Sequence, residues 1–279
     1  MKCNACPRKC NVDRSTSLGF CNEGEKIRIA KIINNFKWEE PPISGTNGTC
    51  AIFFSGCNLK CSFCQNYKIS RGNVGNLYSP EEFAEILKQA DESDNESIDL
   101  ITPTHFTGQI LEAFRIYKPK KRVVWNSSGY ESLASIEKIA KYVDIFLPDF
   151  KYFSPELSLQ FSKAKDYFDV ASRAIKRMSE LKPNKLKNGN LVQGVIIRHL
   201  VLPFHAKDSF EIFNFIKQNI DDPIISVMSQ FIPNGEDKEG RKLNIIEYKT
   251  VLSHIKKLGL TKGYFQELSS ADENYIPEF

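Results

Sequence analysis

Three closely spaced cysteines are the residues of this sequence best suited to chemistry. Cys57, Cys61 and Cys64 form a C-x3-C-x2-C triplet that follows an apolar run at 51–54. Four thiolates would complete a zinc site or an iron–sulfur cluster, whereas three leave one metal position without a protein ligand. The triplet therefore predicts a cluster with one open iron. The alternative is a structural zinc loop with Cys50 as fourth ligand, which we disfavour because Cys50 falls within a predicted strand.

A second set of cysteines lies at the N-terminus. Cys3, Cys6, Cys10 and Cys21 occur in a segment without hydrophobic periodicity, which cannot form a core of its own. Their spacing suits either zinc or a fully ligated [4Fe–4S] cluster, and the sequence does not separate the two. Four free thiols are a third and less favoured interpretation. We therefore predict a second metal site here.

The composition is that of an ordinary globular protein. The 279 residues carry a net charge of +4, with basic and acidic residues dispersed, which argues against nucleic-acid binding. No apolar run is long enough to span a membrane, and the N-terminus does not have the pattern of a secretory signal. Eight clustered cysteines without such a signal favour metal ligands over disulfides, so we expect a cytoplasmic protein with no membrane partner.

Apolar runs typical of buried strands alternate with amphipathic windows typical of helices. The predicted strands are 50–54, 98–102, 122–126, 143–147, 194–200, 224–230 and 263–266. The predicted helices are 80–90, 108–117, 132–142, 166–181, 209–220 and 246–258. A short strand is expected at 27–33, a connection at Pro41-Pro42 and a surface loop at 184–190. Apolar strands separated by helices predict a parallel sheet covered on its outer face, and this number of units fits a complete or partial barrel.

The triplet, with an aromatic residue at Phe63, resembles the hallmark loop of the radical S-adenosylmethionine (SAM) superfamily. The resemblance covers residues 49–279 and implies an α/β fold, a partial (β/α)6 TIM-like barrel, preceded by a Cys-rich head and lead-in segment at 1–48. It also implies a [4Fe–4S] cluster on the triplet, whose open iron chelates the amine and carboxylate of SAM. Electron transfer into SAM would release a 5′-deoxyadenosyl radical that abstracts hydrogen from a substrate.

The Cys-rich head, the triplet and Thr-Pro-Thr-His at 102–105 are similar to one branch related to pyruvate formate-lyase activating enzyme. That resemblance implies an oxidoreductase with a reducing partner such as flavodoxin or ferredoxin, and it suggests a protein substrate on which a glycyl radical is made. Radical SAM modification of a peptide or a small metabolite is an alternative. An alternative of another class is an iron–sulfur or zinc protein for electron transfer or binding.

The early strand ends supply candidate SAM contacts, because the catalytic groups of barrels lie at the carboxyl ends of strands. Phe63 matches the family position whose backbone touches the adenine. The Gly-Gly-Glu motif of many members is absent after the second strand, so Thr102 and Thr104 are expected to line the SAM site instead. His105 is a candidate proton donor, a candidate SAM contact, or a cap of the next helix.

The later strand ends add further polar candidates. Asp149 and Lys151 resemble the Asp-x-Lys segment that faces the SAM carboxylate in glycyl-radical activating enzymes. Arg198 lies in an apolar run, where an unpaired charge is costly, and we expect it to contact the SAM carboxylate or ribose. Asn126 and Gln230 are candidates for ribose, carboxylate or adenosine contacts, and their alternatives are a simple turn and buried amide packing.

Overall fold

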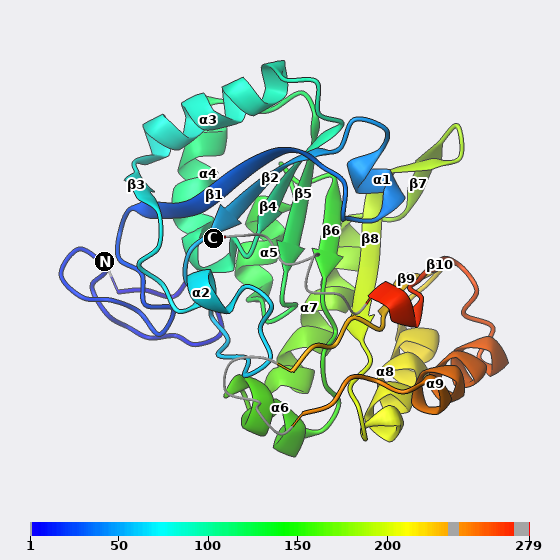
Figure 1. The fold of residues 1–279 in the computed structure, drawn as a ribbon. Helices are drawn as coiled ribbons and strands as arrows, with labels where there is room; N and C mark the ends of the chain where they lie inside the picture. The colour runs from blue at the N-terminus through cyan, green and yellow to red at the C-terminus, as the bar shows by residue number, and fades with distance from the viewer. Residues whose placement is uncertain (1, 234–239, 271–278) are drawn as a thin grey trace.

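The computed structural model describes residues 2–233, 240–270 and 279, and a single ten-stranded sheet organises this part of the chain (Figure 1). The strand order is β10-β9-β8-β6-β5-β4-β2-β1-β3, and β7 pairs with β8. Neighbours from β2 to β10 on this path are parallel, whereas β1 and β3 are antiparallel additions beside β2. The strands are β1 Ile27–Phe36, β2 Thr49–Phe54, β3 Asn76–Tyr78, β4 Ser97–Ile101, β5 Arg122–Ser127, β6 Ile145–Pro148, β7 Lys185–Lys187, β8 Asn190–Leu200, β9 Ile224–Met228 and β10 Gly263–Phe265.

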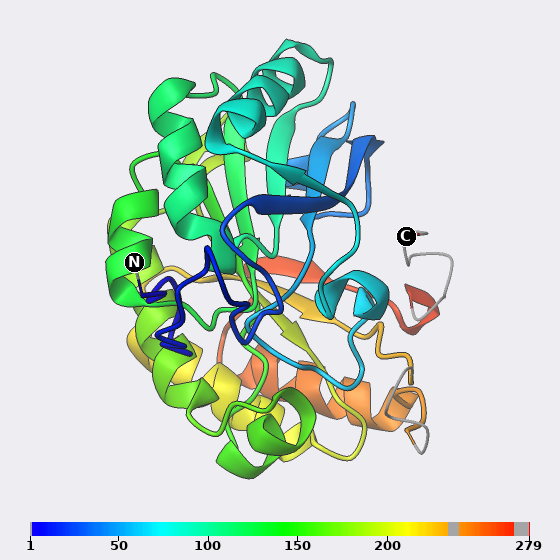
Figure 2. The ribbon, with the colours of Figure 1, turned by 90° about the vertical axis from the view of Figure 1, so that its left-hand side faces the viewer.

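Helices connect the parallel strands and cover the outer face of the sheet. Figure 2 shows them as an arc around the strands. They are α3 Pro80–Glu92, α4 Thr107–Ile116, α5 Leu133–Ile139, α6 Pro155–Ser162, α7 Tyr167–Leu181, α8 Ala206–Asn219 and α9 Ile245–Lys257. Two short helices lie elsewhere: α1 Pro41–Ser44 precedes β2, and α2 Tyr67–Ser70 follows the cysteine loop. Short 3-10 turns are present at Thr104–Phe106 and Leu268–Ser270. The start of α3 shows the local cause: Ser79 accepts a hydrogen bond from the Glu82 amide, and Pro80 opens the helix.

Each predicted strand and helix is present, with shifted ends, and the predicted partial barrel is confirmed. Two local interpretations were wrong. The loop expected at 184–190 contains β7, which forms a hairpin with β8, because Asn188 and Gly189 both adopt the positive φ of a tight turn. The connection expected at the paired prolines is the short helix α1, since proline is well placed at the first helical position.

The lead-in segment belongs to the sheet. Strand β1 pairs with β2, from Ile29 opposite Phe54 to Phe36 opposite Thr49. The domain boundary expected at residue 48 therefore falls between two paired strands. The head before β1 packs against the barrel near the carboxyl ends of its strands. There Arg8 Nε donates to the Asn58 carbonyl at 2.8 Å, and the Ser135 hydroxyl donates to the Ala5 carbonyl at 2.8 Å.

The interior of the barrel is closed at the amino ends of its strands. Side chains alternate along each strand, so one face of the sheet meets the helices and the other faces the interior. Ile43 of α1 packs against a cluster of inward residues from β5, β6 and β8. These are Val124, Ile145, Leu147, Leu191 and Ile196. The apolar layer leaves space for a site only nearer the carboxyl ends.

Candidate active site

A cavity of about 350 Å³ lies at the carboxyl ends of the parallel strands. Its wall combines the cysteine loop with polar side chains from the ends of β5, β6, β8 and β9, and with the segment between β1 and α1. The residues that matter below are Phe36, Trp38, Glu39, Glu40, Phe53, Cys57, Cys61, Phe63, Cys64, Gln65, Thr102, Asn126, Asp149, Lys151, Arg198, Gln230 and Gln266. This is the position at which α/β barrels carry their catalytic groups.

The cysteine loop is held in place by hydrogen bonds from two sides. Within the loop, the Leu59 amide donates to Cys57 Sγ at 3.4 Å. From α6, the Ser162 hydroxyl lies 3.0 Å from Cys61 Sγ, and the Ser62 amide donates to the Phe161 carbonyl at 2.8 Å. The loop is therefore tied to the helix after β6 as well as to β2.

The donor set fits an iron–sulfur cluster with one open position. Burial, with the neighbouring Cys61 and Cys64, raises the pKa of Cys57 to about 12. Burial and Cys61 likewise raise the pKa of Cys64. Three thiolates this close would repel one another in a buried place unless a cationic group neutralised them. Cys50 cannot add a fourth ligand, because its side chain lies on the face of β2 that points away from the cavity, in the core beneath the helices.

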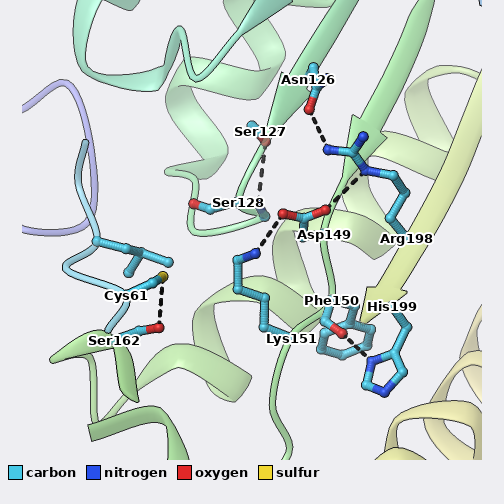
Figure 3. A network of polar contacts seen from close by, with 12 residues as sticks. Cys61, Asn126, Ser127, Ser128, Asp149, Phe150, Lys151, Ser162, Arg198 and His199 are labelled. Atoms are coloured by element: carbon cyan, nitrogen blue, oxygen red, sulfur yellow. Dashed lines mark hydrogen bonds and ion pairs between the residues drawn. The ribbon is translucent and has the colours of Figure 1, made fainter. Parts of the chain in front are cut away.

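A continuous chain of charged and amide groups lines the wall opposite the loop (Figure 3). Lys151 Nζ lies 2.6 Å from Asp149 Oδ2, and Arg198 Nε lies 3.0 Å from Asp149 Oδ1. Arg198 also donates to Asn126 Oδ1 at 2.5 Å and pairs with Glu39 at 3.0 Å. The structure thus brings together four predicted site residues from the ends of β5, β6 and β8.

The charged groups of this network, Asp149, Lys151, Arg198 and Glu39, influence one another's pKa values. Burial alone would raise the pKa of Asp149, but Lys151 and Arg198 outweigh it and hold that pKa below its usual range. Burial raises the pKa of Glu39 to about 7, an effect that Arg198 partly offsets. Burial and the neighbouring Glu39 raise the pKa of Asp99 well above its usual range. Glu39 and Asp99 therefore hold protons more tightly than Asp149 does.

The other predicted residues divide between the cavity and the layer behind it. Phe63 and Gln230 lie in the cavity wall, and the Phe63 ring packs against Phe231 with centroids 5.3 Å apart. Thr104 and His105 lie outside the wall formed by the described residues. The Thr104 hydroxyl donates to Glu131 at 2.6 Å. His105 Nε2 lies 2.7 Å from the Ser55 carbonyl, and burial lowers its pKa to about 3, so His105 is a neutral link between strand ends.

Thr102 adopts an unusual backbone conformation at the cavity wall. Its φ is +63°, a region that glycine enters freely and a β-branched residue enters only at a cost in strain. Its amide donates to the Asn126 carbonyl at 2.8 Å. Thr102 thus has a backbone conformation typical of glycine, at the strand end where the sequence lacks the Gly-Gly-Glu motif.

Several cavity residues were missed by the sequence analysis. Glu39 and Glu40 precede the paired prolines, in a segment interpreted as a connection. Gln65 and Gln266 join Gln230 in a chain of amides, in which Gln230 donates to Gln65 at 3.2 Å and accepts from Gln266 at 2.8 Å. For Glu39 and Glu40, two adjacent acids before two prolines were the only hint in the sequence. The contacts among the three glutamines depend on tertiary structure alone.

The four head cysteines lie near one another. Cys10 Sγ and Cys21 Sγ both approach Gly19, and the Phe20 amide donates to Cys10 Sγ at 3.3 Å. Burial, with the neighbouring Cys21 and Cys10, raises the pKa of Cys6 to about 12. Among the described residues, no three His, Cys, Asp or Glu side chains are arranged around a single ion position. The predicted second metal site therefore stays a prediction.

Comparison with known proteins identifies the family. The family model of the radical SAM superfamily matches residues 51–213, more than half of the chain. A relative from Methanocaldococcus jannaschii, described as an uncharacterized protein, is 34% identical over 277 residues, covering 94% of this chain and 76% of the relative. The chain belongs to the radical SAM superfamily.

Solved structures share the fold at low sequence identity. Streptococcus suis SuiB bound to SAM aligns with a TM-score of 0.54 and 15% identity, covering 77% of this chain and 49% of SuiB. SuiB bound to its precursor peptide SuiA aligns with a TM-score of 0.53 and 16% identity, covering 77% and 48%. The chain thus spans about half the length of SuiB. Native anSMEcpe with bound SAM aligns with a TM-score of 0.52 and 13% identity, covering 76% and 61%.

No helix in the described parts of the chain is both long enough and apolar enough to cross a membrane.

Proposed function

We propose that this protein is a radical SAM oxidoreductase that cleaves SAM reductively and thereby begins hydrogen abstraction from a substrate. The observation that carries the proposal is one cavity in which three neighbouring thiols lie opposite a wall of charged, hydrogen-bonded side chains. When bound, a [4Fe–4S] cluster and SAM supply the electron and the hydrogen-abstracting group. The protein supplies their ligands, their orientation and the exclusion of water.

The side chains of this chain have separate roles in that proposal. Cys57, Cys61 and Cys64 would hold the cluster. Lys151 makes one ion pair with Asp149 while its ammonium carries three donors, so it can also meet the carboxylate of SAM. Phe63 gives an apolar surface beside the loop.

The branch related to pyruvate formate-lyase activating enzyme is the finer assignment that we favour. The Asp149-Phe150-Lys151 segment supports it, together with Thr-Pro-Thr-His after β4. This assignment makes a glycine of a protein the substrate, and a flavodoxin or ferredoxin the electron donor. Peptide modification is the second candidate, supported by the likeness of the fold to SuiB, which has been solved with a precursor peptide.

Formation of 5′-deoxyadenosine tests the proposed class. The reconstituted and reduced protein should convert SAM to 5′-deoxyadenosine under anaerobic conditions. Alanine at Cys57, Cys61 or Cys64 should abolish this activity together with the cluster on the loop. Cys50→Ser is the matched control and should retain both. Near wild-type rates in the triplet variants would refute the assignment.

We further propose that the head binds a second metal centre, zinc or a second [4Fe–4S] cluster, in a reducing cytoplasmic environment. The proximity of Cys6, Cys10 and Cys21, and of Cys3 to Cys21, supports it. Cys10→Ser should lower the zinc or iron content by one centre, because Cys10 is a ligand in this proposal. It should leave the SAM-responsive paramagnetic signal of the triplet cluster in place. Unchanged metal content would show that the head binds none.

A further inference from the structure

The hydroxyl of Ser162 lies between a thiol of the cysteine loop and a buried phenol. Ser162 Oγ is 3.0 Å from Cys61 Sγ, a contact that Figure 3 shows, and 2.7 Å from the Tyr152 hydroxyl. Ser162 and Tyr152 are both fully buried. The three groups therefore form a hydrogen-bonded row that runs from the protein core to the cysteine loop.

The end of helix α6 keeps the Ser162 hydroxyl beside the loop. Ser162 is the last residue of α6, and its carbonyl accepts a hydrogen bond from the Lys60 amide at 3.3 Å. The carbonyl of Phe161 accepts from the Ser62 amide at 2.8 Å. The helix end is thus bonded to the residues on both sides of Cys61, so the distance between hydroxyl and sulfur is fixed by the backbone.

The ring of Tyr152 is held by aromatic neighbours. It stacks on Phe161 with ring centroids 6.4 Å apart, and it packs edge-on against Tyr167 with centroids 5.4 Å apart. Burial raises the pKa of Tyr152 well above its usual range, so the phenol keeps its proton. Within the described residues, the Tyr152 hydroxyl has no hydrogen-bond partner other than Ser162 Oγ.

The direction of the two hydrogen bonds follows from their protons. A cysteine that holds a metal is a thiolate and has no proton to donate. The proton between Ser162 and Cys61 must then come from the serine, which is left with lone pairs to accept the proton of Tyr152. Each hydroxyl proton is used once, and the two bonds polarise each other in the same direction.

We propose that Ser162 donates a hydrogen bond to the Cys61 thiolate and thereby raises the reduction potential of a cluster on the triplet, with Tyr152 orienting the serine hydroxyl. This inference rests on the proposed function, because it concerns the reduction that precedes SAM cleavage. A donor stabilises the sulfur most after the electron has entered, when the negative charge is greatest. One electron is taken up from the reductant, no bond breaks, and the serine proton stays on its oxygen.

The reduction potential, followed by paramagnetic resonance, tests this role without turnover. The reconstituted protein is titrated with dithionite in the absence of SAM, and the signal that changes on later addition of SAM identifies the triplet cluster. In Ser162→Ala we expect about a three- to tenfold shift toward the oxidised form, which is roughly 30–60 mV for one electron. Tyr152→Phe should lower the potential by less, because Ser162 can still donate but is no longer polarised.

Ser158→Ala is the matched control. Ser158 is another buried serine of α6, and its hydroxyl donates to the Pro155 carbonyl at 3.1 Å. This variant should keep the wild-type potential. A second measurement is electron–nuclear double resonance after exchange into heavy water. The reduced wild type should show a strongly coupled exchangeable proton that is missing from Ser162→Ala.

The outcomes separate this inference from the proposed function. An unchanged or higher potential in Ser162→Ala at full cluster content would overturn it, as would an equal fall in Ser158→Ala, which would assign the effect to repacking of α6. If Ser162→Ala holds no cluster, Tyr152→Phe decides, since that variant keeps the serine. Loss of the cluster in both would show that the hydroxyls serve folding and that the inference is wrong. Absence of a triplet cluster in the wild type would instead refute the proposed function and this inference together.

Discussion

The guanidinium of Arg198 and the carboxylate of Glu39 lie 3.0 Å apart, and this ion pair joins two segments separated by 159 residues. Arg198 belongs to β8, whereas Glu39 precedes the first parallel strand. Both side chains are nearly buried, so the lead-in segment completes the charge balance inside the barrel. Arg198 therefore has a structural partner in addition to any contact with SAM.

Removal of Arg198 should cost stability as well as SAM affinity. Arg198→Ala would leave Glu39 and Asp149 buried with one fewer counter-charge. Loss of one partner of a buried pair costs about 3–5 kcal/mol. We expect a lower midpoint in urea denaturation, and a smaller loss for Glu39→Gln, which keeps a hydrogen-bond acceptor. Equal stability of wild type and Arg198→Ala would contradict the role of this pair.

Lys151→Ala should weaken SAM binding with little change in cluster content. Lys151 lines the cavity beside the thiol loop and is not a cysteine ligand, so its loss would remove the charged hydrogen bond to SAM proposed above. Such a bond is worth roughly 1.5–3 kcal/mol, or about tenfold in affinity. Anaerobic calorimetry measures the change, with Lys88→Ala on the exposed surface of α3 as the control. Affinity within about twofold of wild type would assign Lys151 to support of Asp149.

The contribution of Glu131 to stability should fall as the pH rises from about 4.5 to 7. This carboxyl group is buried and accepts hydrogen bonds from Thr104 and Trp125. Burial raises its pKa from 4.5 to about 7. The folded state thus holds a proton that the unfolded state has released, and its stabilising effect disappears as the pH passes the folded pKa.

Glu131→Gln should flatten that dependence. Glutamine keeps the acceptor oxygen for Thr104 and Trp125 but cannot ionise. Relative to wild type, the variant should gain on the order of 1–3 kcal/mol between pH 4.5 and 8. Thermal melting across this range measures the difference. Parallel curves for the two proteins would show that Glu131 does not titrate in this window.

Thr102→Gly should be more stable than Thr102→Ala. The φ of +63° strains any residue with a β-carbon, and glycine removes that strain. We expect a difference of about 1 kcal/mol in chemical denaturation. The alanine variant separates backbone strain from loss of the hydroxyl. If alanine matches or exceeds glycine, the strain inferred at this strand end is absent.

The sequence predicted the barrel well, because its signals are local. Apolar runs and capping residues such as Ser79 act within a few residues, so the order of strands and helices followed from them. The triplet was similarly readable, since its ligands lie on one loop. The strand ends also indicated Asn126, Asp149, Lys151 and Arg198, which the barrel topology brings to one edge.

Contacts between segments that are distant in the sequence could not be predicted from it. Nothing near Glu39 indicates that it will meet Arg198, and Glu40 resembles a surface acid before a turn. His105 follows a strand end, as a catalytic group would, yet its side chain turns to the Ser55 carbonyl behind the cavity. The direction of a side chain in a loop depends on packing that the local pattern does not encode. The hairpin of β7 was the exception, since Asn188-Gly189 is a local signal.

Gly56, one residue before the first ligand of the triplet, has a consequence for the order of maturation. A β-carbon at Gly56 would lie 2.5 Å from the Cys21 carbonyl oxygen, so the backbone of the head rests directly on the start of the thiol loop. The folded head therefore forms one side of the place where a cluster on the triplet would be held. We therefore expect assembly of a cluster on the triplet to require a folded head.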